Sequence, residues 1–214
     1  MARELNFTAI ILKKQPLGEA DEIITFFTRE SGKIRGLAKS VKLAKSKLQN
    51  SLQTLFLVDL SVAGSGNLPK IIRAQPEETF PNLRENLFLI KQAFYVSELV
   101  LKFTPDGQKN EKLFDLLLEF LKFLQTNNGS LELALAKFKT DFLSAIGFAA
   151  IYHQDLAKLQ PQLKQCMELE KTSFRNIGSR DFGEIAPLQK FLSDFIVNHL
   201  EREVRSEKFL KSVV

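Results

Sequence analysis

The hydrophobic pattern changes its period near Pro81, and this change constrains the fold more than any other feature. Before Pro81, five short segments rich in β-branched and aromatic residues are separated by turn residues, a pattern typical of strands. We expect strands at Phe7–Lys14, Glu22–Thr28, Gly32–Ala38, Leu55–Val62 and Pro69–Ala74. Five short strands in about 75 residues favour a small barrel or a strongly curled sheet.

After Pro81 the apolar residues recur at steps of three and four, which indicates helices. We expect helices at Asn82–Phe103, at Leu113–Leu124, from the N-cap Ser130 to near Gly147, and at Leu188–His199, with Glu201–Leu210 continuing or following the last. Leu156–Gly183 is less regular and predicts one short helix and a loop. The sequence therefore predicts an α+β protein, with a five-stranded barrel at residues 1–80 and an all-helical domain at residues 81–214.

The positive charge is concentrated in the barrel module. The chain has a formal net charge of +5, and residues 1–80 hold 12 Lys and Arg against 8 Asp and Glu, while the remaining 134 hold 18 against 17. A basic module attached to a neutral remainder is typical of proteins that bind nucleic acid, or less often an anionic membrane surface.

The stretch Gly32–Leu48 carries six cations and no Asp or Glu. Its first half is the predicted strand, with Lys33 and Arg35 on one face and Ile34 on the other. Its second half resembles a mobile loop or a short helix. A run of one sign suits a polyanionic partner, although a solvated surface is the alternative. The candidate phosphate contacts are Lys33, Arg35, Lys39, Lys42, Lys45 and Lys47, with Lys13, Lys14, Arg29, Lys70 and Arg73 as a second group.

Small barrels that bind single strands often add aromatic side chains on which bases stack. Phe26 and Phe27 are adjacent on a predicted strand and so face opposite sides, which would leave one of them available to a base. The alternative is that the helical half covers the second Phe. In that case binding depends on phosphate contacts, ignores base sequence and weakens steeply with salt.

The sequence offers no catalytic or cofactor motif. Gly32-Lys33 lacks the other residues of a phosphate-binding loop, and no glycine-rich dinucleotide fingerprint follows a predicted strand. The single Cys166 excludes an internal disulfide and a multi-cysteine metal site. No signal peptide and no apolar run of about 18 residues is present, so we expect a cytoplasmic protein. Because catalytic and cofactor motifs are missing, we expect that it is not an enzyme and holds no cofactor.

The motifs of the chain, taken in order, resemble those of the bacterial DNA repair protein RecO family. After the strand AIILKK come the turn residues Gly18, Glu19 and Asp21, then the hairpin FTRESG (27–32), then the basic segment AKSVKLAKS (38–46). The resemblance continues through FYVSELVLKF (94–103), KLFDLLLEFL (112–121), FKTDFLSAIGF (138–148) and RSEKFL (205–210), and so covers nearly the whole chain.

The resemblance implies an OB-fold barrel followed by a helical domain, and a recombination mediator associated with the nucleoid. Such a protein binds single- and double-stranded DNA, anneals complementary strands without ATP, and works with RecR to load RecA onto DNA coated by single-stranded DNA-binding protein (SSB). The helical domain would take the acidic, Phe-ending tail of SSB. Two alternatives remain: an adaptor whose basic surface meets an acidic protein tail, and an RNA-binding OB-fold protein.

One feature departs from the family pattern. Many members hold zinc in the helical domain through two C-x-x-C pairs, which would lie within residues 160–186 here. Cys166 occupies the first position, but Leu169 occupies the second, and the other pair has no cysteine near Phe182–Ile185. One thiolate cannot hold structural zinc, so we expect no metal, and a segment stabilised by packing.

Overall fold

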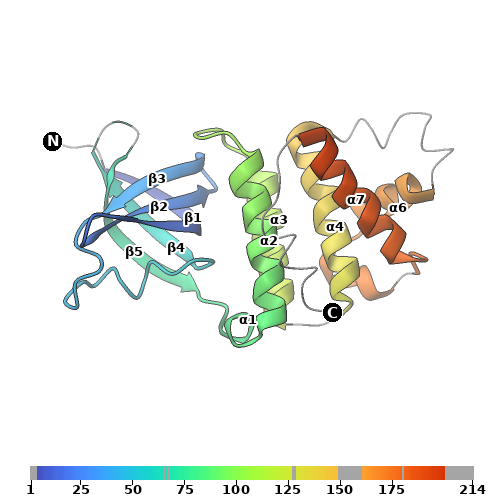
Figure 1. Ribbon diagram of the computed structural model, residues 1–214, viewed down its shortest axis with the longest axis horizontal. Helices are drawn as coiled ribbons and strands as arrows, with labels where there is room; N and C mark the ends of the chain where they lie inside the picture. Colours follow the sequence, from blue (N-terminus) through green and yellow to red (C-terminus); the bar gives the residue numbers. More distant parts are fainter. Residues whose placement is uncertain are drawn as a thin grey trace. The chain divides into compact units, whose positions relative to one another are not determined.

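A computed structural model of the chain describes residues 4–64, 66, 68–126, 129–148, 161–179 and 181–200 (Figure 1). The expected helix at Glu201–Leu210 lies outside these residues. The chain forms two compact units. One contains the chain up to Pro81 together with Thr104–Phe114, and the other contains Asn82–Phe103 and the described residues from Asp115 onward.

Five strands form a closed barrel in the order β1-β2-β3-β5-β4, drawn in blue and teal in Figure 1. Their neighbours are antiparallel except for β3 and β5, which pair in parallel through Leu37 and Lys70. This arrangement confirms the α+β class with an N-terminal OB-fold barrel. The strands are β1 (Glu4–Leu17), β2 (Asp21–Thr28), β3 (Gly32–Ala38), β4 (Leu57–Ala63) and β5 (Lys70–Glu78).

The long first strand closes the barrel because it pairs along both of its edges. Its first part pairs with β4, from Glu4 to Ile10, and its later part pairs with β2, from Ala9 to Leu17. A bulge between Ile11 and Lys13 shifts the register there, as bulges do where strands bend sharply. Alternate side chains then fill the interior, and Ile24, Phe26, Val58 and Leu60 belong to one buried core cluster.

The second unit is helical, as the change of hydrophobic period predicted. One expected helix is divided in two: α1 ends before Asn86 and α2 begins after it. The Asn86 side-chain oxygen accepts hydrogen bonds from the amides of Phe88 (2.9 Å) and Leu89 (3.3 Å), so Asn86 caps α2. The first helices are α1 (Pro81–Glu85), α2 (Leu87–Phe103), α3 (Glu111–Thr126) and α4 (Leu131–Leu143).

The predicted start of α4 at Ser130 is confirmed, because the Ser130 hydroxyl oxygen accepts a hydrogen bond from the Leu133 amide (3.3 Å). A π-helical turn, η1 (Ser144–Phe148), follows α4 and contains Gly147 at φ 101°. Within the described part of Leu156–Gly183 the expected short helix is present, and a 3-10 helix occurs where a loop was expected. The remaining elements are α6 (Pro161–Glu170), η3 (Phe174–Ser179) and α7 (Ile185–Leu200). In the described ranges, no helix is long and apolar enough to cross a membrane.

Candidate nucleic-acid interface

The outer face of the barrel carries the cations of β3. Gly36 and Ile34 lie in register with the core residues Ile24 and Phe26 of β2, so Lys33 and Arg35 project outward, as the alternation predicted. Thr25 of β2 pairs with Arg35 on one side and with Lys13 of β1 on the other. Arg35 and Lys13 therefore lie on one row across three strands. Both are exposed, so this row can meet a phosphate backbone.

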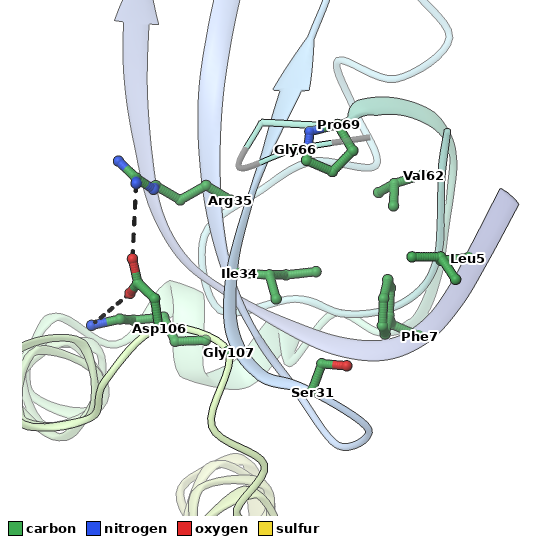
Figure 2. A pocket seen from close by; sticks show the side chains of 11 residues that line it. Leu5, Phe7, Ser31, Ile34, Arg35, Val62, Gly66, Pro69, Asp106 and Gly107 are labelled. Carbon is green, nitrogen blue, oxygen red and sulfur yellow. Dashed lines mark ion pairs between the residues drawn. The ribbon is translucent and has the colours of Figure 1, made fainter. Parts of the chain in front are cut away.

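Lys33 is engaged inside the barrel unit. Its side chain is only 12% exposed, it pairs with Asp106 at 3.3 Å, and it donates a hydrogen bond to the Thr104 carbonyl at 2.6 Å. Asp106 also reaches Arg35 at 3.8 Å, an ion pair drawn in Figure 2. The Asp106 carboxylate thus occupies the position in which an anionic ligand would contact Lys33 and Arg35. Its negative charge offsets one of these two positive charges.

A segment far along the chain covers part of this face. Gly107 donates its amide N–H to the Lys33 carbonyl at 2.8 Å. Phe114, in the first turn of α3, stacks on Phe27 with ring centroids 6.2 Å apart, and the Arg29 guanidinium lies 4.8 Å from the centre of the same Phe114 ring. We call Thr104–Phe114 the covering segment.

The covering segment decides whether Phe26 or Phe27 is accessible to a nucleic-acid base. Phe26 and Phe27 are both fully buried, Phe26 in the barrel core and Phe27 beneath Phe114. The idea that one of them is open to a base is therefore wrong, and the alternative, in which a part of the helical half covers Phe27, is confirmed.

The basic loop, residues 39–56 between β3 and β4, consists of turns and not of a helix. Two buried side chains, Val41 and Leu52, anchor it in the barrel core. The Ser40 amide donates to a carboxylate oxygen of Asp21 at 2.7 Å, and the Lys42 amide donates to the Ala20 carbonyl at 3.1 Å. The loop therefore presents its charges from a fixed base.

Four lysines of this loop are exposed. The Lys42 ammonium donates to the Gly18 carbonyl at 3.4 Å, a contact that leaves its charge uncompensated. Within the described part of the chain, none of the four pairs with a carboxylate. They form a cationic surface that can follow a phosphate backbone: Lys39, Lys42, Lys45 and Lys47.

The second group of candidates also contains both cations that pair with a carboxylate and cations that are exposed. Lys14 pairs with Glu22 at 3.4 Å, and Arg73 pairs with Asp59 at 3.1 Å. Arg29 lies over Phe114, as described above. Lys13, inside β1, and Lys70, the first residue of β5, are both exposed. All of these remain candidate phosphate contacts. Lys13 and Lys70 can bind a phosphate without first breaking an ion pair that the structure shows.

One feature that the sequence did not reveal is a pocket of about 410 Å³ in the barrel unit. We call it the barrel-end pocket. Leu5, Phe7, Ile34, Val62 and Pro69 face its interior in Figure 2, while Arg35, Asp106 and Gly107 lie along one side. The pattern that could have indicated this pocket is the alternation of Leu5 and Phe7. It extends β1 toward the N-terminus beyond its expected start.

The residues present do not fit the zinc site of the family pattern. Cys166 is fully buried, and burial raises the pKa of its thiol to about 12, so the thiolate that zinc requires is disfavoured. Leu169, at the second cysteine position, is also fully buried, and Phe182 is nearly so. Among the described residues, no three His, Cys, Asp or Glu side chains gather where they could hold a metal.

A partly buried ion pair joins two residues of α4 in the helical unit. Lys137 pairs with Asp141 at 2.6 Å and donates to the Leu169 carbonyl at 3.1 Å. Burial raises the pKa of Asp141 to about 6, although the Lys137 charge opposes the rise. A carboxyl with such a pKa changes its charge under mildly acidic conditions.

Two family models of recombination protein O match the chain. The model of its N-terminal part matches residues 1–80, and the model of its C-terminal part matches residues 84–185. The first match corresponds to the barrel strands and the second to the helical elements up to the start of α7.

Individual relatives give the same result. A protein described as DNA repair protein RecO from Dehalococcoides mccartyi (strain CBDB1) is 35% identical over 163 residues, which are 76% of this chain and 60% of the relative. A protein of the same description from Pelotomaculum thermopropionicum is 34% identical over 143 residues, 67% of this chain and 55% of the relative. The chain therefore spans less than two thirds of the length of these relatives.

Proposed function

The chain belongs to the RecO family, and on that premise we propose that it is a DNA-binding recombination mediator in DNA repair. In this proposal it anneals complementary strands without ATP. Together with RecR it loads RecA onto single-stranded DNA coated by SSB, whose acidic tail binds the helical unit. The DNA contacts are the cations of β3 and of the basic loop. A second group of candidate contacts consists of Lys13, Lys14, Arg29, Lys70 and Arg73.

The exposed lysines of the basic loop are the observation that carries the proposal. Four like charges on one loop repel one another, and they have no carboxylate partner in the described part of the chain. Surface charges normally occur with both signs interspersed, so a single-sign cluster stores a repulsion that a polyanion relieves. DNA relieves it further, because each neutralised phosphate releases a condensed counterion.

The same electrostatics explains annealing without a nucleotide. Two complementary strands repel each other through their phosphates, and a basic surface that neutralises phosphates on both strands lowers this repulsion. Contacts made only to phosphates leave the base edges free to pair. Annealing of this kind requires no phosphate-binding loop, and the sequence contains none.

An annealing assay with two complementary oligonucleotides, without nucleotide, tests the proposal. The wild-type chain should accelerate annealing, and a Lys39→Ala, Lys42→Ala, Lys45→Ala triple variant should accelerate it much less. A control triple variant removes three exposed charges from the helical unit and should behave like the wild type: Lys164→Ala, Lys171→Ala and Lys190→Ala.

Three results would contradict the proposal. Wild-type protein that leaves the annealing rate unchanged would exclude strand annealing. Equal losses in both triple variants would show that net charge matters and the loop does not. A clear preference for RNA over DNA of the same sequence would assign the barrel to RNA binding.

A further inference from the structure

The barrel-end pocket has an apolar interior that the fold leaves open to solvent. Leu5 and Phe7 are two residues apart on β1 and face the same side, and Leu5 is 38% exposed. Leu5 pairs in register with Val62 of β4, and both line the pocket. Apolar surface kept in contact with water costs free energy, so a ligand that covers these side chains gains from their burial.

Phe7 is the aromatic residue of this pocket. It packs against the barrel core on one side and lines the pocket on the other, and it is only partly buried. Phe26 and Phe27, in contrast, are unavailable to any ligand. Phe7 is therefore placed to do what neither of them can, namely to offer a ring face to a flat ligand.

The charged groups of the pocket lie on one side, and Ser31 adds a hydroxyl at another edge. In Figure 2 Arg35, Asp106 and Gly107 lie opposite Leu5 and Val62, with Ile34 between the two sides. Lys33 and Arg35 bring two positive charges and Asp106 brings one negative charge, so the rim keeps one net positive charge. A ligand that fits has flat apolar faces, a polar edge and an anionic group beside it.

A nucleotide of single-stranded DNA has all three properties. Resting on the proposed function, we propose that the barrel-end pocket binds one unpaired nucleobase, with Phe7 as its stacking surface and Arg35 as the contact of the adjoining phosphate. The volume of about 410 Å³ lies in the range of small-ligand sites. Only one base is held at each protein molecule, so the neighbouring bases stay free to pair.

This arrangement makes the barrel selective for single strands. A base in a duplex is paired and stacked, and it must leave the helix before it can enter a pocket, which costs free energy. For an unpaired base this free-energy cost is smaller, because no base pair has to be broken. Phosphate contacts alone recognise both forms of DNA, so the pocket adds a preference that the basic loop cannot supply.

A comparison of two oligonucleotides of equal length and charge tests the proposal. One carries thymine at every position, and the other has the same backbone without bases. The wild type should bind the thymine strand about tenfold more tightly, as expected for one stacked base. Equal binding to both strands would overturn the pocket while leaving the proposed function intact. Failure to bind either strand would contradict the proposed function itself.

Two matched variants locate the preference. Phe7→Leu keeps an apolar side chain but removes the ring, and it should reduce the preference for the thymine strand to nearly one while leaving the salt dependence unchanged. Phe88→Leu makes the same change at an exposed Phe of α2, and it should keep the preference. Thermal unfolding verifies that both variants are folded.

Two outcomes of the variant experiment would overturn the proposal. One is a folded Phe7→Leu variant that retains the full preference for the thymine strand. The other is a Phe7→Leu variant that loses affinity for an acidic peptide ending in Phe while its preference for bases is unchanged, which would assign the pocket to a peptide.

Discussion

Replacing Gly32 by Ala should detach the covering segment from the barrel. Gly32 has φ +65°, and a Cβ built on it would lie 1.9 Å from the Gln108 carbonyl oxygen, a backbone atom that cannot turn aside. The covering segment must therefore move away. This movement loses the hydrogen bond between the Gly107 amide and the Lys33 carbonyl, and loosens the stacking of Phe114 on Phe27.

The expected loss of stability combines three contributions of known size. An Ala at positive φ costs about 1 kcal/mol, a lost backbone hydrogen bond about 1 kcal/mol, and a disrupted aromatic pair about 1 kcal/mol. We therefore expect Gly32→Ala to lower the free energy of unfolding by about 3 kcal/mol. Urea unfolding, followed by circular dichroism, measures this change.

Gly18→Ala is a matched control for this prediction. Gly18 has φ +61°, nearly the same as Gly32, but a Cβ there would meet nothing within 4 Å. It should cost only the backbone strain, about 1 kcal/mol. Equal losses in Gly18→Ala and Gly32→Ala would refute the reasoning, because they would show that the covering segment does not bear on the Gly32 position.

Three further predictions follow from single groups. Asp106→Asn should steepen the salt dependence of single-stranded DNA binding by about 0.7 in slope, because it removes the carboxylate that pairs with Arg35. The control Asp194→Asn, at an exposed position, should leave the slope unchanged. Equal slopes for the wild type and both variants would contradict the prediction that Asp106 competes with DNA. The pKa of Asp141 rises from 3.8 to about 6 on folding, so its carboxyl stabilises the fold below pH 4 and loses that contribution as the pH rises to about 6. The free energy of unfolding of wild type minus that of Asp141→Asn should accordingly fall by about 3 kcal/mol over that interval and stay constant above it, and a flat difference in urea unfolding would argue against it. Because Cys166 has no second cysteine, a zinc chelator should leave the unfolding temperature unchanged, and a drop of several degrees or stoichiometric zinc in the purified protein would overturn this prediction.

Local patterns predicted the barrel well, because each strand is defined by its own alternation and its own turns. The boundaries of β3, Gly32–Ala38, agree with the structure. The alternation also placed Arg35 outward and Ile34 inward correctly. The helix boundary at Ser130 was equally local, since a side-chain cap depends on residues three positions apart.

Long-range contacts were beyond these patterns. Thr104–Gly107 predicted only the end of a helix, and nothing in the sequence indicated that Asp106 would meet Lys33, 73 positions earlier. A count of charges cannot distinguish a lysine held in such a pair from an exposed one on the basic loop. The break at Asn86 was hidden for a related reason, because the apolar period continues across it.

The salt dependence of binding to a single-stranded oligonucleotide tests the central claim most directly. The dissociation constant would be measured at several salt concentrations for the wild type, for the Lys39, Lys42 and Lys45 triple alanine variant, and for the Lys164, Lys171 and Lys190 control. Each lost phosphate contact on a single strand flattens the slope by about 0.7, so the loop variant should lose about 2 units of slope and the control none. A loop variant with the slope and affinity of the wild type would contradict the claim that this loop binds DNA.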